Sequence, residues 1–184
     1  DRDGARTTEA GVADLPRLVA EVGGQGLAVS LDVVEEQDGA ASRLPRGVGL
    51  AANQVGVATR VAVIDAEGQR FAMVNPRVVE PGPKEVAEEG CLSIPDYFAE
   101  VKRPGTVVLE ALDRDGKTFR LEAKGLVARA IQHEIDHLDG ILFVDHLSPL
   151  KREMLLKRYK REHAGDASYI QDVSAVTPER DADD

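Results

Sequence analysis

The sequence lacks several features that mark special classes of protein. It contains no tryptophan and one cysteine, Cys91, so no disulfide can form within the chain and a reducing compartment is its natural setting. No run approaches the roughly 18 apolar residues of a membrane-spanning helix. Residues 1–30 also lack a basic start followed by an apolar signal segment. We therefore expect a cytoplasmic protein with no membrane partner.

Basic residues are too few to balance the acidic ones, because 23 Lys and Arg stand against 33 Asp and Glu, giving a net charge of -10. Such a surface does not bind nucleic acid or anionic lipid as a whole, so any contact with a polyanion must be local. Only seven Phe and Tyr accompany a hydrophobic fraction of 42%, which predicts a mainly aliphatic core. The length of 184 residues fits one main domain, expected to be a monomer.

The two ends of the chain differ in composition from its middle. Residues 1–14 are polar and mixed in charge, and residues 164–184 hold six acidic residues against one arginine, without apolar periodicity. These compositions predict a flexible amino terminus and a disordered acidic tail. Residues 15–163 are then expected to form a single domain that holds any catalytic site.

Strand and helix patterns occupy the middle of the chain. RVAVID and RFAMVNP (residues 60–76) flank the turn AEGQ, and TVVLEAL and KTFRLEA (residues 106–123) flank DRDG, so two β-hairpins are predicted. Residues 125–138 have helical periodicity, and Asp139 with Gly140 would end that helix. The order lacks regular strand–helix alternation. It predicts an α+β fold, with antiparallel β-sheets packed around this central helix and a further helix at the carboxyl end.

The predicted central helix carries the stretch QHEIDHLDG. His133 and His137 are four residues apart and share one helical face, so both imidazoles can bind one metal ion, while Glu134 reaches the remaining side. This H-E-x-x-H spacing is typical of metallohydrolases, and a chance amphipathic helix with solvated histidines is the alternative. His146 and His163 have no such context and are expected to lie at the surface or the core edge.

A catalytic metal site commonly has three protein ligands and one open position, so a third ligand is needed. A metzincin-like continuation requires histidine at position 143, where this sequence has Phe143. Glu153 or Glu162 would suit a gluzincin-like site, but both lie in a basic amphipathic stretch. Cys91, in EEGCLSIP, is a further candidate because thiolate binds borderline ions strongly; otherwise it is a small buried hydrophobic residue. The residues alone leave the third ligand open.

A third segment, GVGLAANQVG at residues 47–56, has glycines that permit close approach of the backbone to a ligand, and Gln54 adds an uncharged donor. Alone, it indicates a glycine-rich turn before a strand. Together, GVGLAANQVG, EGCLS and QHEIDH occur in this order and at these separations, and they resemble the three motifs of the peptide deformylase family. The resemblance covers roughly residues 45–163. Residues 1–44 lack the proline-containing opening and the long acidic helix that the family leads one to expect.

The resemblance implies a hydrolase that removes the formyl group from the formyl-methionine of nascent polypeptides and releases formate, as a step of N-terminal protein processing. It also implies that Cys91, His133 and His137 bind one divalent metal ion. That ion would be iron(II) in the cell, although zinc, nickel or cobalt also suits a site of one thiolate and two imidazoles.

Catalytic roles follow from the same resemblance. Glu134 would act as general acid/base for attack by a metal-bound hydroxide on the formyl carbon. The Gln54 side chain and the backbone N–H of Leu92 would stabilise the negative charge that develops on the formyl oxygen. Glu89 and Arg103 match two positions that form a salt bridge in relatives, and we expect them to support the ligands from behind.

The helical stripe that faces the metal also predicts a substrate pocket. Leu126 and Ala130 lie seven and three residues before His133, where they can line an apolar pocket for the methionine side chain, with Val48 and Gly49 near its mouth. Core packing is the alternative for these residues.

One segment reverses the acidic charge balance. Residues 149–163 (PLKREMLLKRYKREH) hold six Lys and Arg against two Glu, and Ser148 followed by Pro149 predicts a helix start. One interpretation is a solvated face opposite an apolar stripe that packs on the domain. The expected stripe consists of Leu150, Met154, Leu155 and Tyr159. The other interpretation, implied by the resemblance, is a helix that docks on ribosomal RNA through phosphate contacts.

Overall fold

The computed structural model describes residues 47–164, so the expectations for residues 1–14, for residues 165–184 and for the part of the domain before residue 47 lie outside it. The described elements are, in order, β1 (Gly49–Ala51), η3 (Ala52–Val55), β2 (Val61–Ala66), β3 (Gln69–Pro81), β4 (Lys84–Cys91), β5 (Ile94–Pro104), β6 (Thr106–Leu112), β7 (Thr118–Lys124), α3 (Gly125–Leu138), η4 (Phe143–His146) and α4 (Pro149–Glu162). Within this range, no helix has the length and apolar character needed to span a membrane.

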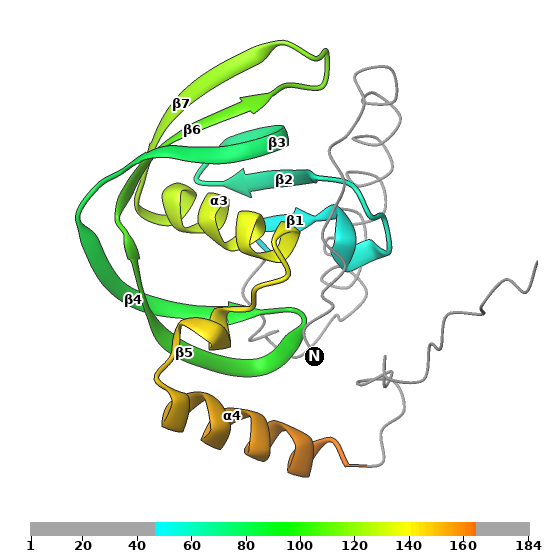
Figure 1. The fold of residues 1–184 in the computed structure, drawn as a ribbon, viewed down its shortest axis with the longest axis vertical. Coiled ribbons are helices and arrows are strands. Elements are labelled where there is room, and N and C mark those ends of the chain that lie inside the picture. The colour runs from blue at the N-terminus through cyan, green and yellow to red at the C-terminus, as the bar shows by residue number, and fades with distance from the viewer. Residues whose placement is uncertain (1–46, 165–184) are drawn as a thin grey trace, which may run out of the picture.

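A five-stranded antiparallel sheet has its strands in the order β1-β2-β3-β6-β7 (Figure 1). Both predicted hairpins are confirmed, because β2 pairs with β3 and β6 pairs with β7. The turn between β2 and β3 consists of Glu67 and Gly68, whose φ angles are 51° and 76°. Positive φ at both central residues is typical of a type I′ turn, whose twist matches that of the flanking strands.

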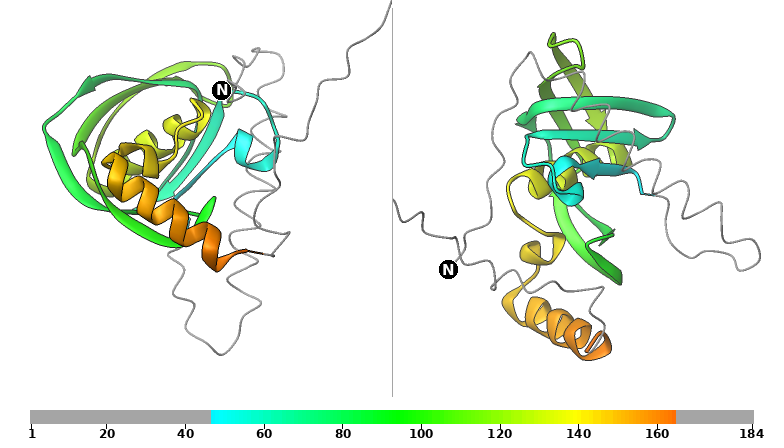
Figure 2. Two further views of the ribbon diagram at one scale, coloured as in Figure 1. Left: turned by 60° about the horizontal axis from the view of Figure 1, so that its bottom comes forward. Right: turned by 90° about the vertical axis from the view of Figure 1, so that its right-hand side faces the viewer.

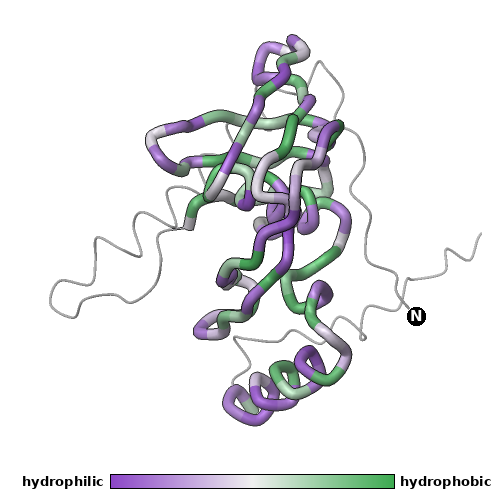
Figure 3. The backbone as a smooth tube through the Cα atoms, turned by 90° about the vertical axis from the view of Figure 1, so that its left-hand side faces the viewer, coloured by the Kyte–Doolittle hydropathy of each residue, from purple (hydrophilic) through white to green (hydrophobic). Residues whose placement is uncertain are grey.

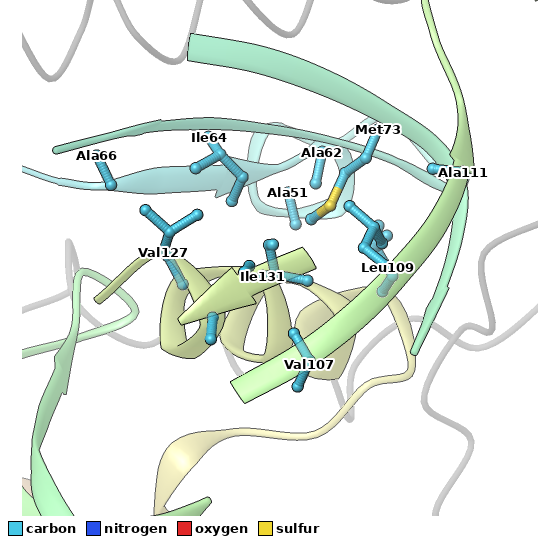
Figure 4. Close-up of a cluster of buried hydrophobic side chains, with 14 residues drawn as sticks. Ala51, Ala62, Ile64, Ala66, Met73, Val107, Leu109, Ala111, Val127 and Ile131 are labelled. Carbon is cyan, nitrogen blue, oxygen red and sulfur yellow. The ribbon is translucent and has the colours of Figure 1, made fainter. Parts of the chain in front are cut away.

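The helix α3 packs against this sheet, which curves around it (Figure 2). Figure 4 shows Val127 and Ile131 of α3 facing strand side chains that include Ile64, Met73 and Leu109. Burying one such aliphatic side chain contributes about 1.5–3 kcal/mol, so the core holds α3 firmly in place. The predicted α+β fold, with antiparallel strands around a central helix and a mainly aliphatic core, is confirmed.

The hairpin of β4 and β5 has no clear signal in the sequence, although it forms a second, two-stranded sheet. Along β4 the first five residues are all exposed, and only Glu89 is fully buried. A strand exposed on both faces lacks the alternation of apolar and polar residues by which strands are identified. Figure 1 shows this hairpin running below α3. Its first strand, β4, ends at Cys91.

The carboxyl-terminal helix α4 begins where the sequence predicts. Ser148 accepts a hydrogen bond from the Lys151 backbone N–H at 3.5 Å, and Pro149 occupies the first turn. The N-cap side chain satisfies one of the donors that every helix leaves unpaired at its start, and proline loses nothing there because its missing N–H would have no partner.

The predicted packing of α4 is only partly correct. Leu155 and Tyr159 pack against the domain, whereas Leu150 and Met154 are 68% and 64% exposed. The expectation of one continuous apolar stripe is therefore wrong. A helix turns about 100° per residue, which places positions 150 and 154 on the side opposite Tyr159. Figure 3 accordingly shows hydrophilic and hydrophobic residues mixed along this helix.

Candidate metal and catalytic site

Two histidines project from the same face of α3. The Nε2 atoms of His133 and His137 are 3.2 Å apart, and the two rings meet nearly edge to face, with centroids 4.8 Å apart. This arrangement follows directly from the four-residue spacing, because one helical turn brings such positions side by side. The predicted pairing of the two imidazoles is confirmed.

Cys91 completes a group of three potential metal ligands. Its Sγ lies 3.1 Å from His137 Nε2, and the three ligand atoms all lie within 4.8 Å of one another. A register shift between β4 and β5 at Gly90 and Cys91 accompanies the end of the strand beside α3. Among residues 47–164, no glutamate of α4 joins this group; Glu162 instead accepts hydrogen bonds from Tyr97 and Arg158. The gluzincin-like alternative is thereby excluded.

The separations of these ligand atoms suit one tetrahedral ion. Usual metal–ligand lengths of about 2.0–2.1 Å for imidazole and about 2.3 Å for thiolate place two nitrogens about 3.3 Å apart, and a nitrogen and a sulfur about 3.6 Å apart. The observed distances are 3.2 Å and 3.1 Å. These two separations are about 0.1 Å and about 0.5 Å shorter than the tetrahedral values, and the remaining pair of ligand atoms lies within 4.8 Å. One thiolate and two imidazoles are also a donor set that borderline transition metals prefer.

Mutual hydrogen bonds shift the pKa values of these groups. Burial alone would raise the pKa of Cys91, but hydrogen bonds with His133 and His137 lower it to about 5. Burial would lower the pKa of His133, but its bonds with Cys91 and Glu89 raise it to about 10. Both shifts favour a thiolate at Cys91 and a protonated imidazole at His133. Because imidazole binds metal as a neutral base, metal binding must release this proton.

Glu134 lies beside the ligands with its side chain almost completely enclosed. It is 3% exposed, and its Oε2 has no hydrogen-bond partner within the described residues. Burial raises the pKa of Glu134 to about 7, against the opposing charges of His133 and His137. Gly49 makes room for it, because a Cβ at this position would come within 2.6 Å of Glu134 Oε1. The enclosed carboxyl is thus poised to exchange a proton near neutral pH.

The side-chain amide of Gln54 has a defined orientation. Its Oε1 accepts a hydrogen bond from the backbone N–H of Ala51 at 2.9 Å, which leaves the Nε2 donor facing Ser93, 3.4 Å away. The bond from the backbone donor fixes which end of the amide is oxygen and which is nitrogen, and so fixes the direction of the Nε2 donor. A donor at this position suits an oxygen that acquires negative charge.

Apart from His137, which lies buried behind Cys91 and His133, these groups border one cavity of about 330 Å³. Each residue that the sequence assigns to catalysis or to the substrate pocket lines it, and so do Cys91 and His133. The predicted residues around it are Val48, Gly49, Gln54, Leu92, Leu126, Ala130 and Glu134. Exposed apolar side chains of Leu92, Phe98 and Leu126 form part of the wall, so the cavity presents both apolar surface and the reactive groups.

A buried ion-pair network supports the ligands from behind. Arg103 donates to both oxygens of Glu89, at 2.6 Å and 3.0 Å, so the predicted salt bridge is confirmed. Glu89 Oε2 lies 3.3 Å from His133 Nδ1. Burial would raise the pKa of Glu89, but these neighbours lower it to about 2. A carboxylate at Nδ1 leaves Nε2 available for a metal and fixes the orientation of the ring.

Other members of this network have no signal in the sequence. Arg103 also donates to Asp136 of α3 at 2.6 Å, and His146 Nε2 lies 2.7 Å from the same carboxylate. Arg129 donates to Glu89 at 2.6 Å. The position of Asp136 one residue before a predicted ligand is the only local hint, because the partners are far apart in the chain.

Comparisons with known proteins agree with this geometry. The family model described as polypeptide deformylase matches residues 16–153. Peptide deformylase 2 of Vibrio vulnificus is 52% identical over 120 residues, which cover 64% of this chain and 71% of the relative. A peptide deformylase of Rhizobium meliloti is 50% identical over 121 residues, covering 62% and 70%.

Solved structures give the same result for the fold. The crystal structure of a peptide deformylase from Legionella pneumophila has a TM-score of 0.71 and 36% identity, and the match covers 88% of this chain and 90% of that one. A peptide deformylase from Ehrlichia chaffeensis in complex with actinonin has a TM-score of 0.69 and 30% identity, covering 89% and 94%.

Proposed function

The chain belongs to the polypeptide deformylase family of enzymes, which remove N-formyl groups from nascent peptides, and on this premise we propose that it hydrolyses the formyl group of peptides that begin with formyl-methionine. The products would be formate and a peptide with a free amino terminus. The observation that carries the proposal is the grouping of Cys91, His133 and His137, two of which line a cavity that Glu134 also lines. Nascent peptides as substrates agree with the expected cytoplasmic location.

The metal ligands in this proposal are Cys91, His133 and His137, which hold one divalent ion. The family resemblance favours iron(II) in the cell, and the same donor set accepts zinc, nickel or cobalt. When bound, the ion supplies a Lewis acid that polarises the formyl oxygen and lowers the pKa of water from 15.7 toward about 7. The carboxylate of Glu89 holds the His133 ring in the orientation that presents Nε2.

Glu134 is the general acid/base in this scheme. It takes a proton from the attacking water and returns it to the amine nitrogen as the bond between the formyl carbon and that nitrogen breaks. A general base works best when its pKa lies near the operating pH, and the pKa of Glu134 is raised to about 7. Its enclosure beside Gly49 limits its movement, so the proton is taken and returned at one place.

Gln54 and Leu92 stabilise the charge that develops on the formyl oxygen. The bond from the Ala51 N–H to Gln54 Oε1 orients the amide, and its Nε2 is the proposed donor. The backbone N–H of Leu92, directly after Cys91, is the second proposed donor. A donor of this kind contributes about 3 kcal/mol to transition-state stabilisation in comparable sites.

The apolar part of the cavity is the proposed site for the methionine side chain. Its volume of about 330 Å³ suits one such side chain together with the formyl-amide group. We assign its wall to Val48, Leu126 and Ala130, which are the apolar predictions that line it. Gly49 contributes only backbone to the wall, and the Glu134 side chain occupies the space that a side chain at position 49 would need.

Formate release from a formyl-Met tripeptide tests the activity directly, with the protein loaded with iron(II) or nickel. We expect turnover with the formyl peptide and none with the acetylated analogue. Cys91→Ser is the decisive variant for the ligand assignment, and it should lose both metal and formate release. Survival of both in that variant would show that the thiolate is not a ligand.

We also propose that α4 docks on ribosomal RNA. Lys151, Lys157 and Lys160 have no acidic partner recorded within residues 47–164, and the exposed side of the helix is basic although the whole chain is acidic. Phosphate contacts would make the binding salt-dependent. Replacing Lys157, Arg158, Lys160 and Arg161 together with Glu should abolish ribosome co-sedimentation and spare deformylation of a short peptide. Unchanged co-sedimentation would refute the docking role.

A further inference from the structure

Asn53 connects the segment that carries Gln54 to the helix that carries the histidines. It belongs to the short helix η3, and its Nδ2 donates a hydrogen bond to the backbone carbonyl of His137. The two residues are 84 positions apart in the chain. The contact therefore spans the interface between the loop with the proposed charge-stabilising donor and the last turn of the ligand helix.

This hydrogen bond is not needed to complete the end of α3. The His137 carbonyl already accepts a hydrogen bond from the Gly140 backbone N–H at 3.0 Å. The other end of the Asn53 amide, Oδ1, is buried without a partner among the described residues. A buried acceptor without a partner is unfavourable, so the side chain as a whole adds little to folding. We therefore looked for the effect of Asn53 in the position of the next residue, Gln54.

The other hydrogen bond that orients Gln54 is local. Ala51, whose N–H engages Gln54 Oε1, lies three residues away in the same segment, so that bond sets the direction of the amide. It does not set the distance between η3 and α3, because both of its ends move together. The bond from Asn53 joins the two elements and does fix that distance.

We propose that Asn53 is a positioning residue that holds the Gln54 amide at a set distance from the metal-ligand end of α3. The inference rests on the proposed function, in which Gln54 donates to the formyl oxygen. Such a donor is effective only within about 2.7–3.1 Å of the developing charge. A displacement of about 1 Å can cost up to roughly a hundredfold in rate, so a bond that fixes this distance matters for turnover even when it adds nothing to stability.

The test compares the full chain with Asn53→Leu, both loaded with nickel. Leucine has the same number of side-chain heavy atoms, branched at the same carbon, and removes both the donor and the unpaired acceptor. We expect kcat to fall roughly 10- to 100-fold, with KM within about twofold, full metal content and an unchanged or higher melting temperature. Asp139→Asn is the matched control: it breaks the 2.5 Å ion pair with Arg60 at the same end of α3 without touching η3. It should keep kcat within about twofold of the parent.

A double-mutant cycle with Gln54→Ala separates positioning from a general defect. If Asn53 acts through Gln54, then Asn53→Leu should lower kcat by less than about twofold once Gln54 is alanine. An equal loss in both backgrounds would overturn the inference, as would an unaffected single variant. Loss of metal from Asn53→Leu would overturn it too, because the contact would then serve His137. Full activity of Gln54→Ala alone would instead refute the donor role in the proposed function, and the positioning role would fall with it.

Discussion

The helices α3 and α4 both contain 14 residues, but they are stabilised in opposite ways. Eight residues of α3 are buried and no side chain caps its start, whereas α4 buries only Tyr159 and is capped by Ser148. Packing therefore holds α3 in place, and local signals have a larger share in holding α4. The core therefore sets the geometry of α3, the helix with the proposed ligands. In contrast, α4 keeps an exposed face that could contact the proposed partner.

The largest expected effect comes from the same substitution made on both helices. Glu134→Gln removes the proposed proton acceptor of α3 and should lower formate release roughly 10³-fold. Glu153→Gln makes the identical change at an exposed position of α4 and should leave the rate within about twofold. Both variants should keep full metal content. Comparable rates for the two variants would mean that Glu134 transfers no proton in turnover.

Arginine substitutions probe how differently the two helices are anchored. Arg103→Ala removes the cation between the buried Glu89 and the half-buried Asp136, leaving both carboxylates with less compensation. Breaking a buried pair in this way costs about 3–5 kcal/mol. On α4, Arg152→Ala breaks an exposed pair with Asp145 and should change stability little. Urea denaturation measures both, and similar losses would show that α3 is not anchored more strongly than α4.

Burial of α3 also predicts a pH dependence. Burial raises the pKa of Glu134 from 4.5 to about 7, despite His133 and His137. Between these values the folded protein binds more protons than the unfolded one, so rising pH destabilises it. As the pH rises from about 4.5 to about 7, the free energy of unfolding of the metal-free wild type should fall by up to about 3 kcal/mol relative to that of Glu134→Gln. Above about pH 7 the difference should not change further. Denaturation at about pH 5 and about pH 8 would measure this, and a gap independent of pH would contradict it.

Features encoded by neighbouring residues could be predicted from the sequence, and features encoded by distant ones could not. The four-residue spacing of His133 and His137 is enough to place both imidazoles together, because one helical turn does so. Cys91 reaches them at the end of β4, whose first five residues are exposed and have no apolar period, so the local sequence does not predict its position beside the histidines. The contact of Asn53 with His137 crosses 84 positions and leaves no local pattern.

The prediction of one continuous apolar stripe on α4 was wrong for a different reason. Leu150 and Met154 are four residues apart, as are Leu155 and Tyr159, so each pair lies on one side of the helix. The first pair, however, faces away from Tyr159. Counting apolar residues without following their angle around the helix merged two faces into one. The exposed pair lies on the side of α4 turned away from the domain, where the sequence interpretation expected only charge.

The smallest expected effect is at the α4 cap, and it tests whether α4 is separate from the site. Ser148→Ala removes the acceptor for the Lys151 N–H and should cost about 0.5–1 kcal/mol, seen as faster hydrogen exchange of α4 amides. Formate release should not change if α4 opens independently. Contacts of Tyr97 oppose that independence, because Tyr97 lines the cavity, its hydroxyl donates to Glu162 of α4 and its ring packs against Tyr159. If Ser148→Ala lowered formate release together with the protection of α4, then α4 would hold the cavity wall in place. The two helices would then differ only in how strongly they support the site.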